Sequence, residues 1–97
     1  RISLLMSAEA NRTYREEIDD ALKRLEDVDL REAAKHMRVS DILDMLHKIN
    51  VAKCNFDEQC MRDSVYLNET FLTTLELINS CTKTMRSSAV LHSIAPK

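Results

Sequence analysis

The chain has 97 residues, of which 44% are hydrophobic and 31% are charged, a composition typical of one folded domain rather than of a disordered tail. It contains no glycine, which excludes the glycine-rich phosphate loops of nucleotide enzymes. The net charge is −2 with acidic and basic residues interspersed, which disfavours direct nucleic-acid binding. We therefore expect a single all-α domain covering residues 1–97, an intracellular segment of a longer protein with no membrane span.

Apolar residues at three- and four-residue spacing predict three helices in the first half of the chain. The first is expected over about Ser3–Leu25, with its inner face in the C-terminal half. Asp29 is a candidate N-cap for a short helix that ends near Arg38. A third helix is expected over about Ser40–Val51 and carries the clearest core stripe. This stripe consists of Ile42, Leu43, Leu46 and Ile49.

The second half of the chain is expected to be more broken. Residues Ala52–Phe56 are predicted to form a connection, followed by a weaker helix over Asp57–Tyr66. Its predicted inward residues are Met61 and Val65. Two further helices are expected, one from Asn68 and one from about Thr84. The expectation is a compact bundle of five to six helices.

Metal and catalytic chemistry find little support in the pattern of histidines and cysteines. The three cysteines include no CxxC pair, and no histidine pair has zinc-finger spacing, so reduced, partly buried thiols are expected rather than a metal site. A cysteine-histidine nucleophile could form only in the fold, and no known signature surrounds a cysteine. We therefore expect no enzyme, no metal and no cofactor. The residues concerned are His36, His47, His92, Cys54, Cys60 and Cys81.

One polar site stands out where the first helix must end. Glu26 and Asp27 lie beside backbone groups that a helix end leaves without partners. Their carboxylates could accept hydrogen bonds from another chain. The alternative interpretation is simple helix capping, and the sequence leaves both open.

Four segments of the chain share a pattern with a known family of helical domains. They are Glu17–Lys23, Leu43–Val51, Phe71–Ile78 and Met85–His92. In this order they resemble helix segments of the integrase-binding domain of lens-epithelium-derived growth factor (LEDGF) and its relatives. The resemblance spans about residues 14–94. The chain departs from that family in a longer connection between the second and third segments. The stretch from Ile78 to Met85 is shorter and lacks the family's basic, phenylalanine-bearing loop.

The resemblance implies a compact right-handed helical bundle that captures short disordered motifs of chromatin and transcription proteins in the nucleus. In that family, an acidic residue after the first long helix accepts hydrogen bonds from the partner's backbone, and a hydrophobic neighbour walls the pocket. The matching positions here are Leu25 and Glu26, with Asp27 as a second candidate. A second interhelix loop would fall at Asn79 to Thr84 and contribute Cys81.

Two functions follow from these patterns. The first is a non-enzymatic receptor for linear motifs, in which a peptide places apolar side chains in a groove while Glu26 or Asp27 fixes its register. The second is a structural helical dimerisation domain of a larger intracellular protein. The N-terminal apolar cluster Ile2-Leu4-Leu5-Met6 favours this self-association.

Overall fold

A computed structural model describes the backbone of residues 2–94 and the side chains of residues 9–90. This part of the chain contains four helices and no strand. The helices are α1 (Ile2–Glu26), α2 (Leu30–Ala33), α3 (Val39–Arg62) and α4 (Leu67–Ile94). The prediction of an all-α fold is confirmed. The predicted number of five to six helices is wrong, because two expected breaks do not occur.

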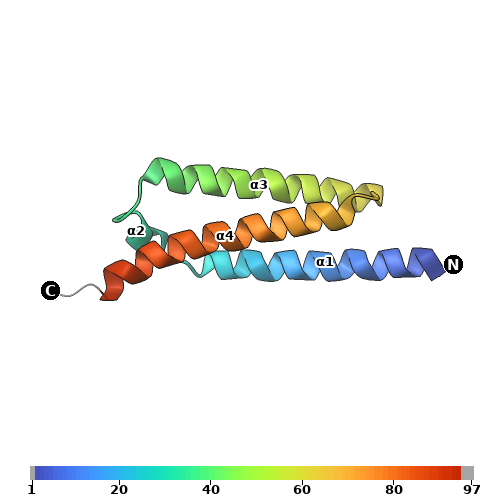
Figure 1. Cartoon of the computed structure of the whole chain (residues 1–97), viewed down its shortest axis with the longest axis horizontal. Coiled ribbons are helices and arrows are strands. Elements are labelled where there is room, and N and C mark those ends of the chain that lie inside the picture. Colours follow the sequence, from blue (N-terminus) through green and yellow to red (C-terminus); the bar gives the residue numbers. More distant parts are fainter. Residues whose placement is uncertain (1, 95–97) are drawn as a thin grey trace.

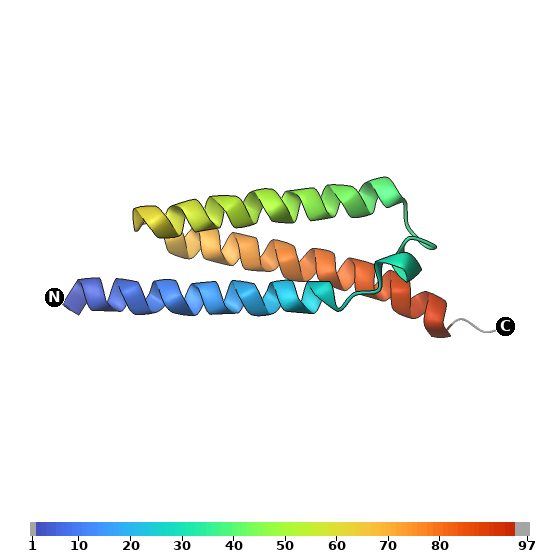
Figure 2. The same ribbon diagram turned by 180° about the vertical axis from the view of Figure 1, so that it is seen from behind.

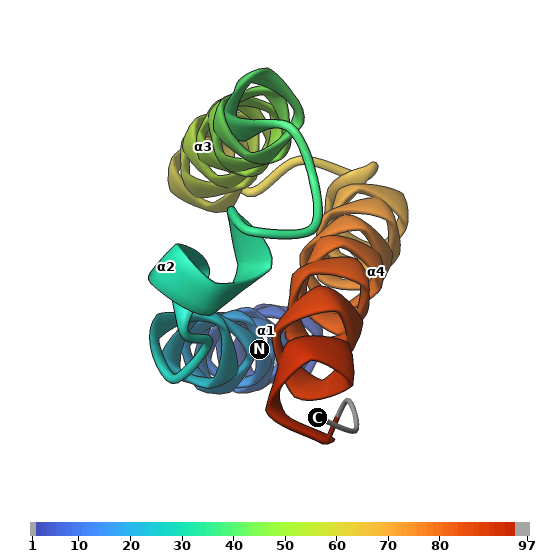
Figure 3. The same cartoon turned by 90° about the vertical axis from the view of Figure 1, so that its left-hand side faces the viewer.

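The three long helices lie side by side, and α4 makes the main contacts with each of the other helices. α1 and α4 run in the same direction, while α3 runs in the opposite direction (Figure 1). Viewed along the rod, the long helices occupy the corners of a triangle, and α2 lies between α1 and α3 at one end (Figure 3). The molecule measures 63 × 22 × 15 Å, with a radius of gyration of 16.2 Å. A compact domain of this length would have about 13 Å, so the bundle is elongated rather than compact.

Three aromatic rings, one from each long helix, pack together in the part of the bundle near the turn between α3 and α4. The Tyr14 ring of α1 stacks on Phe71 of α4 with centroids 4.2 Å apart. Phe56 of α3 is fully buried, and its ring centroid lies 6.5 Å from that of Phe71. The Tyr14 hydroxyl also donates a hydrogen bond of 2.7 Å to Asn68 Oδ1. Aromatic pairs of this kind add stabilisation beyond the area they bury.

Helix α3 continues without a break through the segment in which a connection was expected. Ile42, Ile49 and Phe56 are all buried and recur at seven-residue spacing, so one inner face extends past Val51. Neither glycine nor proline interrupts this segment. The predicted connection over Ala52–Phe56 and the separate helix over Asp57–Tyr66 are therefore wrong.

Several residues of this region that were predicted to lie in the core are exposed. Met61 is 83% exposed and Val65 is 89% exposed, because the inner face of the continuous helix passes through Phe56 and Cys60 instead. Leu43 is 59% exposed, and Leu46 is only half-buried against the core. The core stripe of α3 is therefore rotated by about 40° around the helix axis from the predicted one.

An aspartate ends α3 in the absence of any glycine. Asp63 adopts the left-handed conformation, with φ 52° and ψ 50°. Its N–H donates to the Cys60 carbonyl at 3.3 Å, and the Ser64 N–H donates to the Gln59 carbonyl at 3.2 Å. This pair of bonds satisfies the last carbonyls of the helix in a Schellman motif. The chain then turns back into α4.

Helix α4 also runs through an expected loop. Its buried residues recur at three- and four-residue spacing over most of its length, so the loop predicted at Asn79 to Thr84 does not exist. They are Leu67, Phe71, Thr74, Ile78, Cys81, Thr82, Met85 and Ala89. By contrast, the first helix has nearly its predicted ends. Asp29 caps α2 as predicted, accepting from the Glu32 N–H at 3.2 Å, but α2 ends at Ala33 rather than near Arg38.

Candidate functional site

Two backbone hydrogen bonds close the corner where α1 meets α2. The Asp27 N–H donates to the Lys23 carbonyl at 3.3 Å, and the Val28 N–H donates to the Leu25 carbonyl at 3.1 Å. Asp29 then begins α2 as its N-cap. These bonds close the end of α1 within the chain's own backbone, so the side chains of the connection are not needed to terminate that helix.

A hollow of about 220 Å³ opens between this connection and the C-terminal part of α4. We call it the corner hollow, and it is lined by Asp27, Val28, Asp29, Glu32, Arg86, Ala89 and Val90. Carboxylates come from the connection and α2, and a guanidinium comes from α4. Val28 and Ala89 are buried, while Val90 is 46% exposed. The hollow therefore combines an apolar lining with charged groups at its border.

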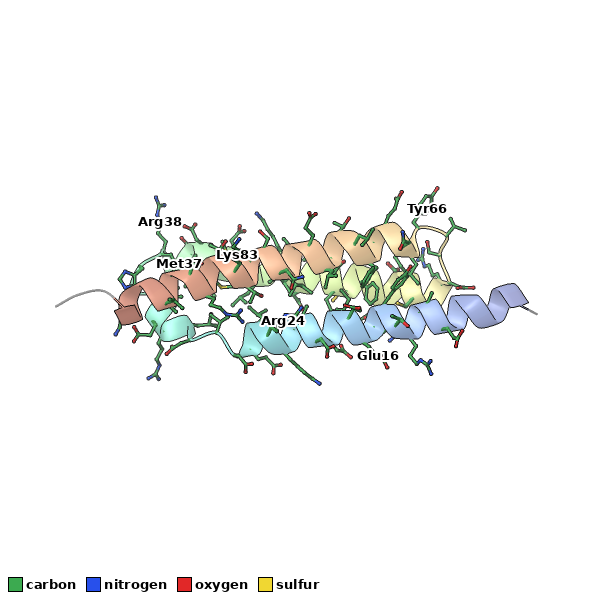
Figure 4. The ribbon with its side chains drawn as sticks, turned by 60° about the horizontal axis from the view of Figure 1, so that its bottom comes forward. Glu16, Arg24, Met37, Arg38, Tyr66 and Lys83 are labelled. Atoms are coloured by element: carbon green, nitrogen blue, oxygen red, sulfur yellow. The ribbon has the colours of Figure 1, made fainter. Side chains whose placement is uncertain are left out.

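Two arginines fasten α4 to the end of α1 beside the hollow. Arg86 Nη2 donates to the Arg24 carbonyl at 3.3 Å, in the last turn of α1. Arg24 Nη2 in turn donates to Asn79 Oδ1 at 3.2 Å, and its side chain lies between α1 and α4 (Figure 4). Because both bonds cross between the helices, they hold the two walls of the corner hollow together.

Acidic groups gather at the end of α1 beside this corner. The C-terminal end of a helix carries a partial negative charge of roughly half an electron. Glu26, Asp27 and Asp29 add three carboxylates within four residues, while Lys23 and Arg24 in the last turn of α1 oppose them. The exposed carboxylate of Asp27 can accept a hydrogen bond from a donor brought to the corner hollow.

Of the four residues that the sequence suggested as a partner-binding site, only Asp27 lines the corner hollow. Leu25 is half-buried and packs against the core, Glu26 is the exposed last residue of α1, and Asp27 is exposed and lines the corner hollow. Cys81 does not join them. It lies within α4, where burial raises the pKa of its thiol, with Lys48 lowering it and Asp44 raising it to a lesser extent.

A second depression, which the sequence did not indicate, runs along the contact between α3 and α4. A hollow of about 520 Å³ there is lined by His47, Lys48, Val51, Ala52, Asn55 and Leu77. An adjoining hollow of about 230 Å³ shares Ala52 and Asn55 and is otherwise lined by α4. The third helix was predicted to end at Val51, so a groove that continues along α3 to Asn55 was not predicted. The signal that could have revealed it is the helical spacing of His47, Val51 and Asn55.

The described side chains offer no arrangement for metal binding. Within residues 9–90, no three histidine, cysteine or acidic side chains gather closely enough to hold an ion. His92 lies outside the described side chains.

Burial raises the pKa of the Cys60 thiol, an effect that nearby Arg15 opposes. Among the described helices, none is long and apolar enough to cross a membrane.

Comparison with known proteins adds no identification. No family model matches the chain, and no curated protein or solved structure is significantly similar to it. The resemblance to the integrase-binding domain therefore stays a prediction carried by the residues quoted above. Any functional proposal depends on that resemblance and on the geometry of the surface.

Proposed function

We propose that this chain is a non-enzymatic interaction domain that captures short, disordered peptide motifs of chromatin- and transcription-associated proteins in the nucleus. The observation that carries the proposal is the corner hollow, where an apolar lining meets the exposed carboxylate of Asp27. Sites that bind peptides commonly pair apolar contacts with a few polar groups that fix orientation. The residue resemblance supports the same proposal independently.

In the proposed mode of binding, a peptide places an apolar side chain against Val28, Ala89 and Val90. Backbone N–H groups of the peptide then donate to the carboxylates of Asp27 and Glu26. Hydrogen bonds to an ionised acceptor are about twice as strong as neutral ones, which fixes the register of the peptide. A hollow of about 220 Å³ accepts only one or two side chains, so we expect affinities in the micromolar range, about −8 kcal/mol.

The structure limits how far the family's mode of binding transfers. The resemblance implies a compact right-handed bundle, and the elongated four-helix rod departs from it. No loop interrupts α4 between Asn79 and Thr84. Cys81 is buried and faces α3 rather than the corner hollow. We therefore propose that recognition depends on the α1–α2 corner alone, which favours short motifs with a single apolar anchor.

Selection from a peptide display library tests this proposal. The library would carry the disordered segments of nuclear proteins, and selections would use the wild-type chain and the variant Glu26→Lys/Asp27→Lys. The matched control is Glu16→Lys/Glu17→Lys, which makes the same charge change on an exposed part of α1 away from the corner; Glu16 projects from the outer side of the bundle (Figure 4).

We expect wild type and control to enrich the same peptides and the corner variant to enrich none of them. Enrichment that survives the corner reversal would move the binding site elsewhere. A wild-type selection that enriches no peptide would overturn the proposal.

A second candidate function is the structural dimerisation domain. The observation that favours it is the exposure of large apolar side chains on α3, among them Val39 at 56%, Leu43 at 59% and Met61 at 83%. The N-terminal cluster Ile2-Leu4-Leu5-Met6 falls in the first turns of α1, which extend past the turn between α3 and α4 (Figure 2). Its side chains lie outside the described residues. Measurement of the oligomeric state tests this second function.

A further inference from the structure

A groove along the contact between α3 and α4 lies outside the corner hollow. We call it the α3–α4 groove, and it consists of two adjoining hollows of about 520 and about 230 Å³ that share Ala52 and Asn55. The two helices run in opposite directions (Figure 1). His47 and Leu77 therefore lie toward one end of the groove, and Asn55 and Glu69 lie toward the other.

The end of the groove near Glu69 presents hydrogen-bonding groups that the chain itself does not use. Thr74 lines the groove although it is only 2% exposed. Thr84 and Ser88 of the same helix each donate a hydroxyl proton to the carbonyl four residues earlier. Within the described residues, by contrast, the side chains of Thr74 and Asn55 make no hydrogen bond. The Thr74 hydroxyl is therefore available to bond a polar group of a ligand in place of water.

These free hydrogen-bonding groups favour an extended peptide over a helix as the occupant. Every residue of an extended backbone has an N–H and a C=O that need partners, whereas a helix satisfies these groups internally. The Asn55 amide on the α3 side and the threonine hydroxyls on the α4 side can both donate and accept. At the other end, Val51 and Leu77 provide apolar walls beside the small Ala52, which suits one apolar side chain.

The uncompensated charge along the groove is negative. Lys48 already pairs with Asp44 at 3.1 Å, so its charge is compensated. Glu69 lines the groove and forms no ion pair with any described residue. Glu76 is likewise unpaired, and a separation of seven residues places it within about 20° of Glu69 around the α4 axis. A cationic side chain therefore complements this rim of the groove.

We propose that the α3–α4 groove binds an extended basic peptide, with an apolar side chain between Val51 and Leu77 and a lysine or arginine at Glu69. At the helical rise, Leu77 and Glu69 lie about 12 Å apart along α4. Four residues of an extended chain cover about 13 Å and bring side chains i, i+2 and i+4 to one face. The middle side chain then lies near Thr74 and is polar. This site is independent of peptide capture at the α1–α2 corner.

Titration of the isotopically labelled chain with short peptides, followed by its amide chemical shifts, measures this binding. The probe is acetyl-Leu-Thr-Gln-Thr-Lys-amide, used in both chain directions up to about 10 mM, because so small an interface should bind in the millimolar range. The control peptide, acetyl-Leu-Thr-Gln-Lys-Thr-amide, has the same composition but turns its lysine away from the groove. We expect the probe to shift the amides of Ala52, Asn55 and Thr74 and to bind at least about threefold more tightly than the control.

Variants of the groove test the hydroxyl and the carboxylate separately. Thr74→Val removes the hydroxyl with little change of volume and should weaken binding of the probe about threefold to tenfold. Its matched control is Thr84→Val, whose lost hydroxyl bonds the Ser80 carbonyl away from the groove, and which should leave the affinity unchanged. Glu69→Lys should reverse the charge preference, so that acetyl-Leu-Thr-Gln-Thr-Glu-amide binds more tightly than the probe. Circular dichroism checks that each variant is folded.

Binding at the groove is distinguishable from binding at the corner. The variant Glu26→Lys/Asp27→Lys should bind the probe as wild type does, so failure of peptide capture at the corner leaves this inference standing. Shifts confined to the corner hollow, or no shifts up to the highest concentration, would overturn it. Equal affinities for the probe and the control peptide would also overturn it, as would transferred nuclear Overhauser effects that show a helical bound peptide.

Discussion

Truncation of Phe56 probes the packing that joins the three long helices. Phe56 lies in the segment where the sequence suggested a connection, yet its side chain is fully buried beside Phe71. Removal of a buried phenylalanine ring costs about 3 to 5 kcal/mol, because the transfer energy is lost and a cavity remains. Loss of the contact between the rings contributes about 0.5 to 1.5 kcal/mol of this. Since domains of this size are stable by roughly 5 to 15 kcal/mol, Phe56→Ala should lose a large share of its stability.

Urea unfolding followed by far-ultraviolet circular dichroism measures the loss as a shift of the transition midpoint. The matched control is Met61→Ala, on the same helix but 83% exposed, for which we expect a change within about 0.5 kcal/mol. Phe56→Leu keeps most of the side-chain volume and should cost about 1.5 kcal/mol or less. A loss below about 1 kcal/mol for Phe56→Ala would show that Phe56 is not in the core and that α3 does not pack as described.

Two further predictions concern the continuity of α3 and the state of the thiols. Asn55→Pro should destabilise the chain by about 3 kcal/mol, because proline removes a hydrogen bond inside the helix, whereas Asn55→Ala should have little effect. Equal stabilities of the two variants in urea would indicate a loop at this position. Cys54, which is exposed, should react quickly with a thiol reagent, while Cys60 and Cys81 should react only on unfolding, because burial shields them and raises the pKa of both thiols. Three equal rates of thiol reaction in the native chain would contradict the assignment. Because the buried thiols have a raised pKa, they deprotonate more readily in the unfolded chain. The free energy of unfolding should therefore fall as the pH rises above the ordinary thiol pKa of 9.0.

Helical periodicity predicted the fold class and the ends of α1, but not the continuity of α3 and α4. In α3, Leu43 and Leu46 were predicted to lie in the core together with Ile42 and Ile49. The observed inner face is rotated slightly around the helix axis from the predicted one and includes Phe56. Only the position of α4 decides which of two adjacent stripes is buried, and one chain's periodicity does not contain that information.

The expected break in α4 has a different origin. Ser80, Thr82 and Thr84 are poor helix formers in isolation. Packing outweighs this preference, since Thr82 is buried between Ile78 and Met85 on the inner face. The Thr84 hydroxyl donates to the Ser80 carbonyl at 3.1 Å, within the same helix. Side chains that compete with the backbone in a peptide are thus accommodated inside a packed helix.

The candidate site was predictable in part for the same reasons. Leu25, Glu26 and Asp27 could be located because a helix end and its charges are local features of the sequence. The opposite wall of the corner hollow, formed by Arg86, Ala89 and Val90, comes from a helix about 60 residues away. Its approach depends on the parallel packing of α1 and α4, which the sequence pattern did not reveal.

Calorimetric titration of one peptide from the display selection tests the proposed function most directly. The peptide is titrated into wild type, into Glu26→Lys/Asp27→Lys and into Glu16→Lys/Glu17→Lys, with thermal melts of all three. We expect the corner reversal to weaken binding about a hundredfold, equivalent to about 2.7 kcal/mol. The control should bind as wild type does, and all three chains should melt within a few degrees of one another, because exposed charges contribute little to folding. Equal affinity of the corner variant and wild type would contradict the proposal, and a collapsed melting temperature of that variant would make Glu26 and Asp27 structural residues.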